Sequence, residues 1–141
     1  MRTTLKDIRY TLASTGNIHS AMVIDKHIEG LFLELTNNLD WDLDTEIDFD
    51  EELSDACDPD EQYVSLDYDL TLVPDNDMDV CVRVKMYVDG TQHYETDGYR
   101  FIENKSFAVT EIIFDYAGDE WDFTKDGRAN KFVNKVLETW I

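Results

Sequence analysis

Basic residues are scarce in this chain of 141 residues, which has 12 Lys and Arg against 32 Asp and Glu and a formal net charge of −20. A nucleic-acid backbone repels a protein of this charge, and so does an anionic membrane surface. Proline and glycine are also few, at two and six residues, which argues against a linker or a low-complexity protein. We therefore expect no direct binding to nucleic acid and none to membranes.

Long apolar runs and cysteines are rare as well. No stretch approaches the roughly 18 apolar residues that a membrane span requires, and the start, MRTTLKDIRY, lacks the apolar region of a secretory signal. Cys57 and Cys81 are the only cysteines. We expect both to be buried, reduced thiols, with a disulfide between them as the alternative. These features predict a cytoplasmic protein, and we favour the cytoplasm of a bacterial host cell.

The composition supports a folded protein. Hydrophobic residues make up 43% of the chain and aromatic residues 12%, which is enough for a core and too much for a disordered acidic tail. The length fits one domain, spanning residues 1–141.

The negative charge is concentrated in the middle of the chain. Residues 1–26 hold two acids and four bases, residues 27–82 hold 19 acids and no Lys or Arg, and residues 83–141 hold 11 acids and eight bases. Within the middle part, residues 40–61 contribute 12 acids. Charge runs are usually solvated tails, so the pattern of the neighbouring residues decides the interpretation.

That pattern alternates. Between Asp40 and Asp50 every second residue is acidic, and the residues between them are Trp41, Leu43, Thr45, Ile47 and Phe49. Residues 63–72 repeat the alternation. A period of two places one set of side chains in a core and the other in water. We therefore expect the acids to lie on a folded sheet, with a loop over residues 40–61 as the alternative, and Trp41 and Tyr63 to belong to the core.

The order of these patterns along the chain predicts an α+β domain, an antiparallel β-sheet of about four to five strands with N-terminal helices and a C-terminal helix. Residues 1–39 are helical, 40–61 form the acidic segment, 62–116 form the sheet, and 126–141 form the last helix. Thr4 with Asp7 resembles a capping box, and Asn17 is placed to cap the second helix. Asp89-Gly90 predicts a hairpin turn, and Asp97-Gly98 predicts another turn or a bulge.

Signatures of catalysis are missing. The sequence has no G-x-G-x-x-G, P-loop lysine, H-E-x-x-H or G-x-S-x-G motif. Its three histidines are too few and too scattered to suggest a zinc site with the two cysteines. Paired carboxylates occur throughout, so no one pair is marked as an acid and base. We expect no enzymatic activity, no cofactor and no metal site.

One segment resembles the calcium loop of the EF-hand family. Residues 40–51 place acids at loop positions 1, 3, 5, 9 and 12, with Ile47 at position 8. The loop departs from the family at position 6, where Thr45 stands in place of the glycine that makes the sharp turn. A second loop beginning at Asp75 lacks both the glycine and the final glutamate. The resemblance implies a calcium-binding module as an alternative function.

In its composition, the acidic middle of the chain is similar to phage-encoded nucleic-acid mimics, the anti-restriction and anti-CRISPR inhibitors. Alternate carboxylates on a strand stand about 6.6–6.8 Å apart, a regular line of negative charge like that of nucleic-acid phosphates. Nineteen such charges match about 32 Å of duplex DNA, which is close to the diameter of a domain of this size. The resemblance implies a non-catalytic inhibitor that blocks the nucleic-acid-binding groove of a basic target, such as a nuclease, a restriction or CRISPR effector, or a DNA-binding regulator. The acids expected to contact this partner are Asp40, Asp42, Asp44, Glu46, Asp48, Asp50, Glu51, Asp58, Asp60, Glu61, Asp67, Asp69, Asp75, Asp77 and Asp79.

The same charge is compatible with further classes of protein. An immunity protein that neutralises a basic toxin would present acids in the same way. A halophile-like surface would spread its acids over the whole exterior, whereas residues 83–141 are nearly balanced. Solubility alone needs a net charge of only about 2–8 in magnitude. A strongly basic protein partner explains the excess best, and the oligomeric state stays open.

Overall fold

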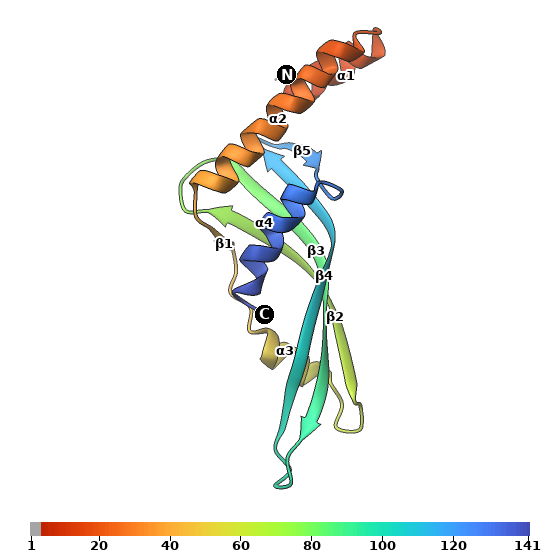
Figure 1. Cartoon of the computed structure of the whole chain (residues 1–141), viewed down its shortest axis with the longest axis vertical. Helices are drawn as coiled ribbons and strands as arrows, with labels where there is room; N and C mark the ends of the chain where they lie inside the picture. The colour runs from red at the N-terminus through yellow and green to blue at the C-terminus, as the bar shows by residue number, and fades with distance from the viewer. Residues whose placement is uncertain (1–3) are drawn as a thin grey trace.

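The computed structural model describes residues 4–141 (Figure 1). Within that range the chain forms four helices and one five-stranded antiparallel sheet of order β1-β2-β3-β4-β5, which confirms the predicted α+β fold. The elements follow one another as α1 (Leu5–Ser14), α2 (Ile18–Asn38), β1 (Trp41–Leu43), α3 (Phe49–Ala56), β2 (Tyr63–Pro74), β3 (Val80–Tyr94), β4 (Arg100–Tyr116), β5 (Asp119–Asp122) and α4 (Gly127–Glu138).

Short polar side chains begin three of the helices. Thr4 and Asp7 form the predicted capping box of α1, and Asp48 and Asp126 accept bonds from backbone N–H groups at the starts of α3 and α4. Each satisfies donors that the first helical turn leaves free. Asn17 precedes α2 as predicted, but its side chain makes no capping hydrogen bond.

The predicted hairpin turn at Asp89-Gly90 is wrong. Strand β3 runs through both residues without a break, and its register with β4 shifts there and again at Lys85/Met86. The glycine is needed for packing, because a Cβ on Gly90 would lie 2.4 Å from the Ile102 side chain. The sheet turns instead at the second Asp-Gly pair, where Gly98 has a φ of +87°. Of the two structures predicted for Asp97-Gly98, a turn or a bulge, the structure shows the turn.

Strand β5 was not predicted. It follows a tight turn at Ala117 and Gly118, whose φ values of 51° and 90° are both in the left-handed region. Trp121 of β5 pairs with Phe114 of β4 and closes the second edge of the sheet. Only four residues long, this strand has too short an alternation to be distinguished in the sequence.

One face of the sheet is covered and the other is open. The covered face carries the even-numbered residues of β3 from Val80 to Val88, which share a core with residues of α2, α3 and α4. Phe32 of α2 lies at its centre, stacked on Phe123 at 4.6 Å and edge-on to Phe114 at 5.1 Å. Because all three helices pack on the same face, the odd-numbered side chains of β3 are left toward solvent.

Two parts of the molecule extend from this body (Figure 1). The free end of the α1–α2 hairpin lies at one end of the long axis, and the turn between β3 and β4 lies at the other. No helix within residues 4–141 has the length and apolar character needed to span a membrane.

Candidate acidic interaction surface

The predicted contact acids gather around one edge of the sheet. Asp67 and Asp69 lie on β2. The others lie on the chain from Asp40 through β1 to Asp48, in the first turn of α3 (Asp50 and Glu51), in the loop from α3 to β2, or in the turn from β2 to β3. All fifteen side chains are exposed. We call this set the acidic margin, and it consists of Asp40, Asp42, Asp44, Glu46, Asp48, Asp50, Glu51, Asp58, Asp60, Glu61, Asp67, Asp69, Asp75, Asp77 and Asp79.

Residues 40–50 do not form the continuous strand that their alternation predicts. Strand β1 ends at Leu43, and Asp48 begins α3. The alternation in burial nevertheless holds, because Leu43 and Phe49 are buried and Trp41 and Ile47 are partly buried, while the acids face water. Thr45 is the exception and is exposed. The chain bends at Asp44 and Thr45, so the alternation holds over β1 and again from Glu46 to Phe49 but is interrupted between them.

Backbone hydrogen bonds hold these segments together. The N–H of Asp75, in the β2–β3 turn, donates to the carbonyl of Asp40 at 2.9 Å, and the N–H of Asp44 donates to Thr71 of β2, also at 2.9 Å. Asp67 and Asp69 lie within the ten consecutive residue pairs of the β2–β3 ladder, which has no bulge. The carboxylates therefore project from an ordered framework.

Gln92 fixes the loop that carries Asp58, Asp60 and Glu61. Its side chain is 6% exposed, and its amide donates to the carbonyl oxygens of Asp58 at 3.1 Å and Glu61 at 2.7 Å. Its own carbonyl accepts from Arg100 at 3.2 Å. Sequence reasoning missed this residue. The signal that could have found it is its position: the even-numbered residues of β3 from Val80 to Gly90 are apolar and point inward, and Gln92 is the polar residue at the next even position.

Positive charge scarcely compensates the acidic margin. Among residues 4–141, Asp50 is its one member with a Lys or Arg nitrogen within 4 Å, and that partner is Lys105. The other fourteen acids have no such ion pair with any described residue. Outside the margin the pattern differs, because Asp25, Glu29, Glu111, Glu120 and Asp126 are each paired with an arginine or a lysine.

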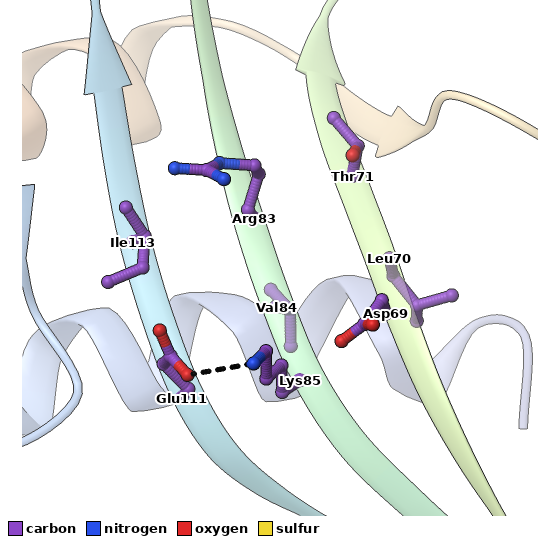
Figure 2. A pocket seen from close by; sticks show the side chains of 8 residues that line it. All are labelled: Asp69, Leu70, Thr71, Arg83, Val84, Lys85, Glu111 and Ile113. Carbon is purple, nitrogen blue, oxygen red and sulfur yellow. Dashed lines mark ion pairs between the residues drawn. The ribbon is translucent and has the colours of Figure 1, made fainter. Parts of the chain in front are cut away.

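The bases nearest to β2 are directed away from it. Arg83 and Lys85 stand on the open face of β3, where the register places Thr71 and Asp69 beside them. Figure 2 shows Lys85 reaching across to Glu111 of β4, a separation of 3.6 Å. Arg83 contacts Glu120 of β5 at 2.5 Å. The open face is thus mixed in charge over β3 to β5 and acidic over β2.

Burial and neighbouring acids together raise several pKa values near the acidic margin. The pKa of Glu61 is raised by its hydrogen bond with Asp58 and by the charges of Asp58 and Asp60. Burial and then the charge of Glu52 raise the pKa of Tyr68 to about 12. Burial and then the charge of Glu61 raise the pKa of the Cys57 thiol. Each shift disfavours one more negative charge beside those already present.

Two acids of the margin also have structural roles. Asp48 caps α3 through Glu51 N–H at 3.1 Å, and Asp42 accepts a hydrogen bond from the indole of Trp140 at 2.7 Å.

Tyr63, expected in the core, is 68% exposed, because it begins β2 on the open face. Trp41 is partly buried and packs against the core, with its ring edge-on to Phe132.

The calcium alternative gains no support from the geometry. Strand β1 takes up loop positions 2 to 4 and pairs with β2, so Asp42 is held by a ladder and not by a coordinating turn, and the carbonyl of Asp40 accepts from the N–H of Asp75. Thr45 does not have the positive φ of the family's glycine position. No group of three or more His, Cys, Asp or Glu side chains in residues 4–141 is placed to hold a metal ion.

Both cysteines are free; Cys57 is buried and Cys81 partly buried.

Comparison of the chain with protein-family models, with curated proteins and with solved structures finds no match.

Proposed function

We propose that this protein is a non-catalytic inhibitor whose acidic margin occupies the nucleic-acid-binding groove of a basic protein. The observation that carries the proposal is the absence of ion-pair partners for fourteen of the fifteen margin acids among residues 4–141. Uncompensated like charges destabilise a fold, so a surface of this kind is best explained by positive charge supplied from outside. A basic groove that normally holds phosphates is such a partner.

The dimensions of β2 fit this partner. Its 12 residues span about 40 Å at roughly 3.4 Å per residue, and margin acids lie before, along and after the strand. One turn of duplex DNA covers about 34–36 Å. A groove built for one such turn can therefore contact the margin over its whole length.

Rigidity of the margin favours affinity. The ladder of β2, the amide of Gln92 and the backbone bond between Asp75 and Asp40 fix the acids before binding. Preorganised charges cost little entropy on association. They also steer a basic partner at long range, so association should be fast and should weaken with added salt.

The experiment compares two variants of equal net charge. One removes Asp44, Asp67 and Asp69 of the margin as Asp→Asn changes, and the control changes Glu34→Gln, Asp119→Asn and Glu138→Gln, which lie outside it. Each variant carries three fewer negative charges than the natural chain. None of the six side chains makes an ion pair or a side-chain hydrogen bond within the described chain.

A nuclease-treated bacterial lysate is bound to immobilised duplex DNA, and the added protein is tested for release of DNA-binding proteins. We expect the natural chain and the control to release the same discrete set, and the margin variant to need about tenfold more protein. Equal loss in the two variants would show an effect of net charge alone. That result, or no release at all, contradicts the proposal.

A further inference from the structure

Strand β2 has a neighbouring strand on its outer side only near its C-terminal end. Strand β1 pairs with residues 72–74 of β2, and the N–H of Asp44 donates to the carbonyl of Thr71. Over residues 63–70, β2 pairs with β3 and with no other strand in the described part of the chain, so it forms the border of the sheet there (Figure 1). We call residues 63–70 the free edge of β2.

The alternation of the ladder shows which backbone groups face outward on this edge. The carbonyl of Gln62 accepts a hydrogen bond from Gln92 of β3 at 2.8 Å, whereas the carbonyl of Thr71 accepts from Asp44 on the outer side at 2.9 Å. In an antiparallel strand both backbone groups of a residue point to one side, and those of the next residue point to the other. The even-numbered residues of β2 therefore bond to β3. The residues whose N–H and C=O groups face outward are Tyr63, Ser65, Asp67 and Asp69.

These outward groups are open to pairing. None of them has a backbone partner among residues 4–141. The ladder behind them has no bulge, and residues 63–70 contain no proline, lysine or arginine. The unpaired stretch of β4, on the other side of the sheet, differs: its ladder has two register shifts, Asn104 has a φ of 54°, and Lys105 is present. Bulges and lysines protect an edge from pairing, so the edge of β2 is the one suited to an added strand.

Charge decides which strand this edge accepts. The side chains of Asp67 and Asp69 are exposed beside the outward backbone groups, and neither has a Lys or Arg nitrogen within 4 Å among residues 4–141. A second copy of β2 would bring these carboxylates close to their own counterparts, and like charges across a ladder are destabilising. A strand with Lys or Arg at every second position matches them instead, because alternate residues of both strands are about 6.6–6.8 Å apart.

We propose that the free edge of β2 binds an extended basic segment of the target protein as an added antiparallel strand. The inference rests on the proposed function for the basic character of the target, and it adds the way in which that target is held. The added strand continues the line of β1. Its main chain bonds to Ser65, Asp67 and Asp69, and its cations lie beside the two carboxylates on the open face.

Synthetic peptides test this mode of binding. The probe is a peptide in which lysine and threonine alternate, with four lysines to match the four outward residues. One derivative carries N-methyl groups on the lysine amides, which face β2 in the antiparallel ladder, and the other carries them on the threonine amides, which face away. The two have the same charge. Isothermal titration calorimetry should show at least about tenfold weaker binding of the lysine-methylated derivative, whereas equal affinities overturn the proposal.

Amide hydrogen exchange, measured by NMR, identifies the residues that pair. The N–H groups of Ser65, Asp67 and Asp69 should exchange rapidly in the free protein and at least about tenfold more slowly when the unmethylated peptide is bound. Leu66 and Leu70 direct their N–H groups to β3, so their exchange should change little. Unchanged exchange at the three outward residues in the presence of saturating peptide overturns the proposal.

A protein variant separates the backbone from the charge. Ser65→Pro removes one outward N–H, leaves every acid in place and breaks no bond to β3. Its affinity for the unmethylated peptide should fall about tenfold, whereas Ser65→Thr keeps the N–H and should bind as the natural chain does. Full affinity in a folded Ser65→Pro variant overturns the proposal, and if that variant does not fold, the methylated peptides decide.

These measurements use neither DNA nor a lysate, so they are independent of the release assay. Failure of the release assay alone rejects the nucleic-acid-binding groove as the target site. Failure of the peptide tests alone rejects the added strand.

Discussion

The indole Nε1 of Trp140 donates a hydrogen bond to Oδ1 of Asp42, 2.7 Å away, and joins two residues that are 98 positions apart. This bond attaches the chain just after α4 to the edge strand β1. Asp42 therefore stabilises the fold in addition to carrying one of the charges of the acidic margin. Variants of this residue must separate the two roles.

Asp42→Ala and Asp42→Asn make that separation. Alanine removes both the charge and the acceptor, and we expect a loss of about 1 kcal/mol in the free energy of unfolding. Asparagine removes the charge but keeps an oxygen at the same position, so most of that stability should remain. Urea unfolding followed by tryptophan fluorescence measures the difference. Equal losses in the two variants would contradict this prediction, because they would show that a neutral oxygen does not preserve the stability that the Asp42 carboxylate provides.

Gly90→Ala should destabilise the protein by about 1–3 kcal/mol, because the added methyl group overpacks the core. Its Cβ would lie 2.4 Å from Cγ2 of Ile102 and 3.7 Å from Leu53. Ile102→Leu moves the branch of that side chain away from the Cβ and should recover part of the loss. A double-mutant cycle by chemical denaturation gives the coupling, and strictly additive effects would contradict the predicted collision.

Asp126→Ala should cost about 1 kcal/mol, because Asp126 caps α4 through the N–H groups of Arg128 and Ala129. Asp126→Asn retains the capping oxygen and serves as the control. Burial alone would raise the pKa of Asp126, but hydrogen bonds from Arg128 and Ala129 hold that pKa below its ordinary 3.8.

A lowered pKa means that the carboxylate stabilises the fold above its ordinary value, and that this contribution disappears as the pH falls through the lowered value. The natural chain should therefore lose stability below about pH 4 more steeply than Asp126→Ala does. Thermal unfolding curves from pH 2 to pH 5 test this. Parallel pH profiles for the two proteins would count against the cap.

Glu61→Gln should raise the melting temperature at pH 7 and have little effect near pH 4. The Asp58 contact raises the pKa of Glu61 above its ordinary 4.5, so the folded protein holds this proton more tightly than the unfolded chain does. Stability from that proton is complete below 4.5 and is lost as the pH rises through the raised pKa.

Glu46→Gln is the matched control for this prediction, because it removes one charge from the same margin without removing the Asp58 contact. Calorimetric melting temperatures at pH 4 and pH 7 provide the comparison. If the two variants respond equally at both pH values, repulsion spread over the whole surface explains the effect and the Asp58–Glu61 pair does not.

The natural chain should also gain stability when salt is added at pH 7. Fourteen margin acids have no Lys or Arg partner within residues 4–141 and repel one another, and at about 0.15 M ionic strength the screening length is roughly 8 Å. We expect the melting temperature to rise between about 0.02 M and 0.5 M NaCl, and to rise less in the variant lacking Asp44, Asp67 and Asp69. A melting temperature independent of salt would indicate that this repulsion is small in the folded state.

Local chemistry made much of the fold predictable. The capping box of Thr4 and Asp7 and the alternation along β2 and β3 depend on residues close in the chain, so short patterns identify them. The hairpin predicted at Asp89-Gly90 failed because the reason for that glycine lies in Ile102 and Leu53, on other elements. No pattern of neighbouring residues contains such a contact.

The sequence by itself determined that the acids cluster between residues 27 and 82, and that their period of two exposes them, because side-chain direction follows from backbone geometry alone. Only the tertiary structure decided which of these acids lack a counter-charge. Arg83 and Lys85 lie beside β2 in the register yet contact Glu120 and Glu111, and Lys105 reaches Asp50 across 55 residues. Ion pairs depend on distances of a few ångströms between side chains, and those distances are set only when strands and helices pack.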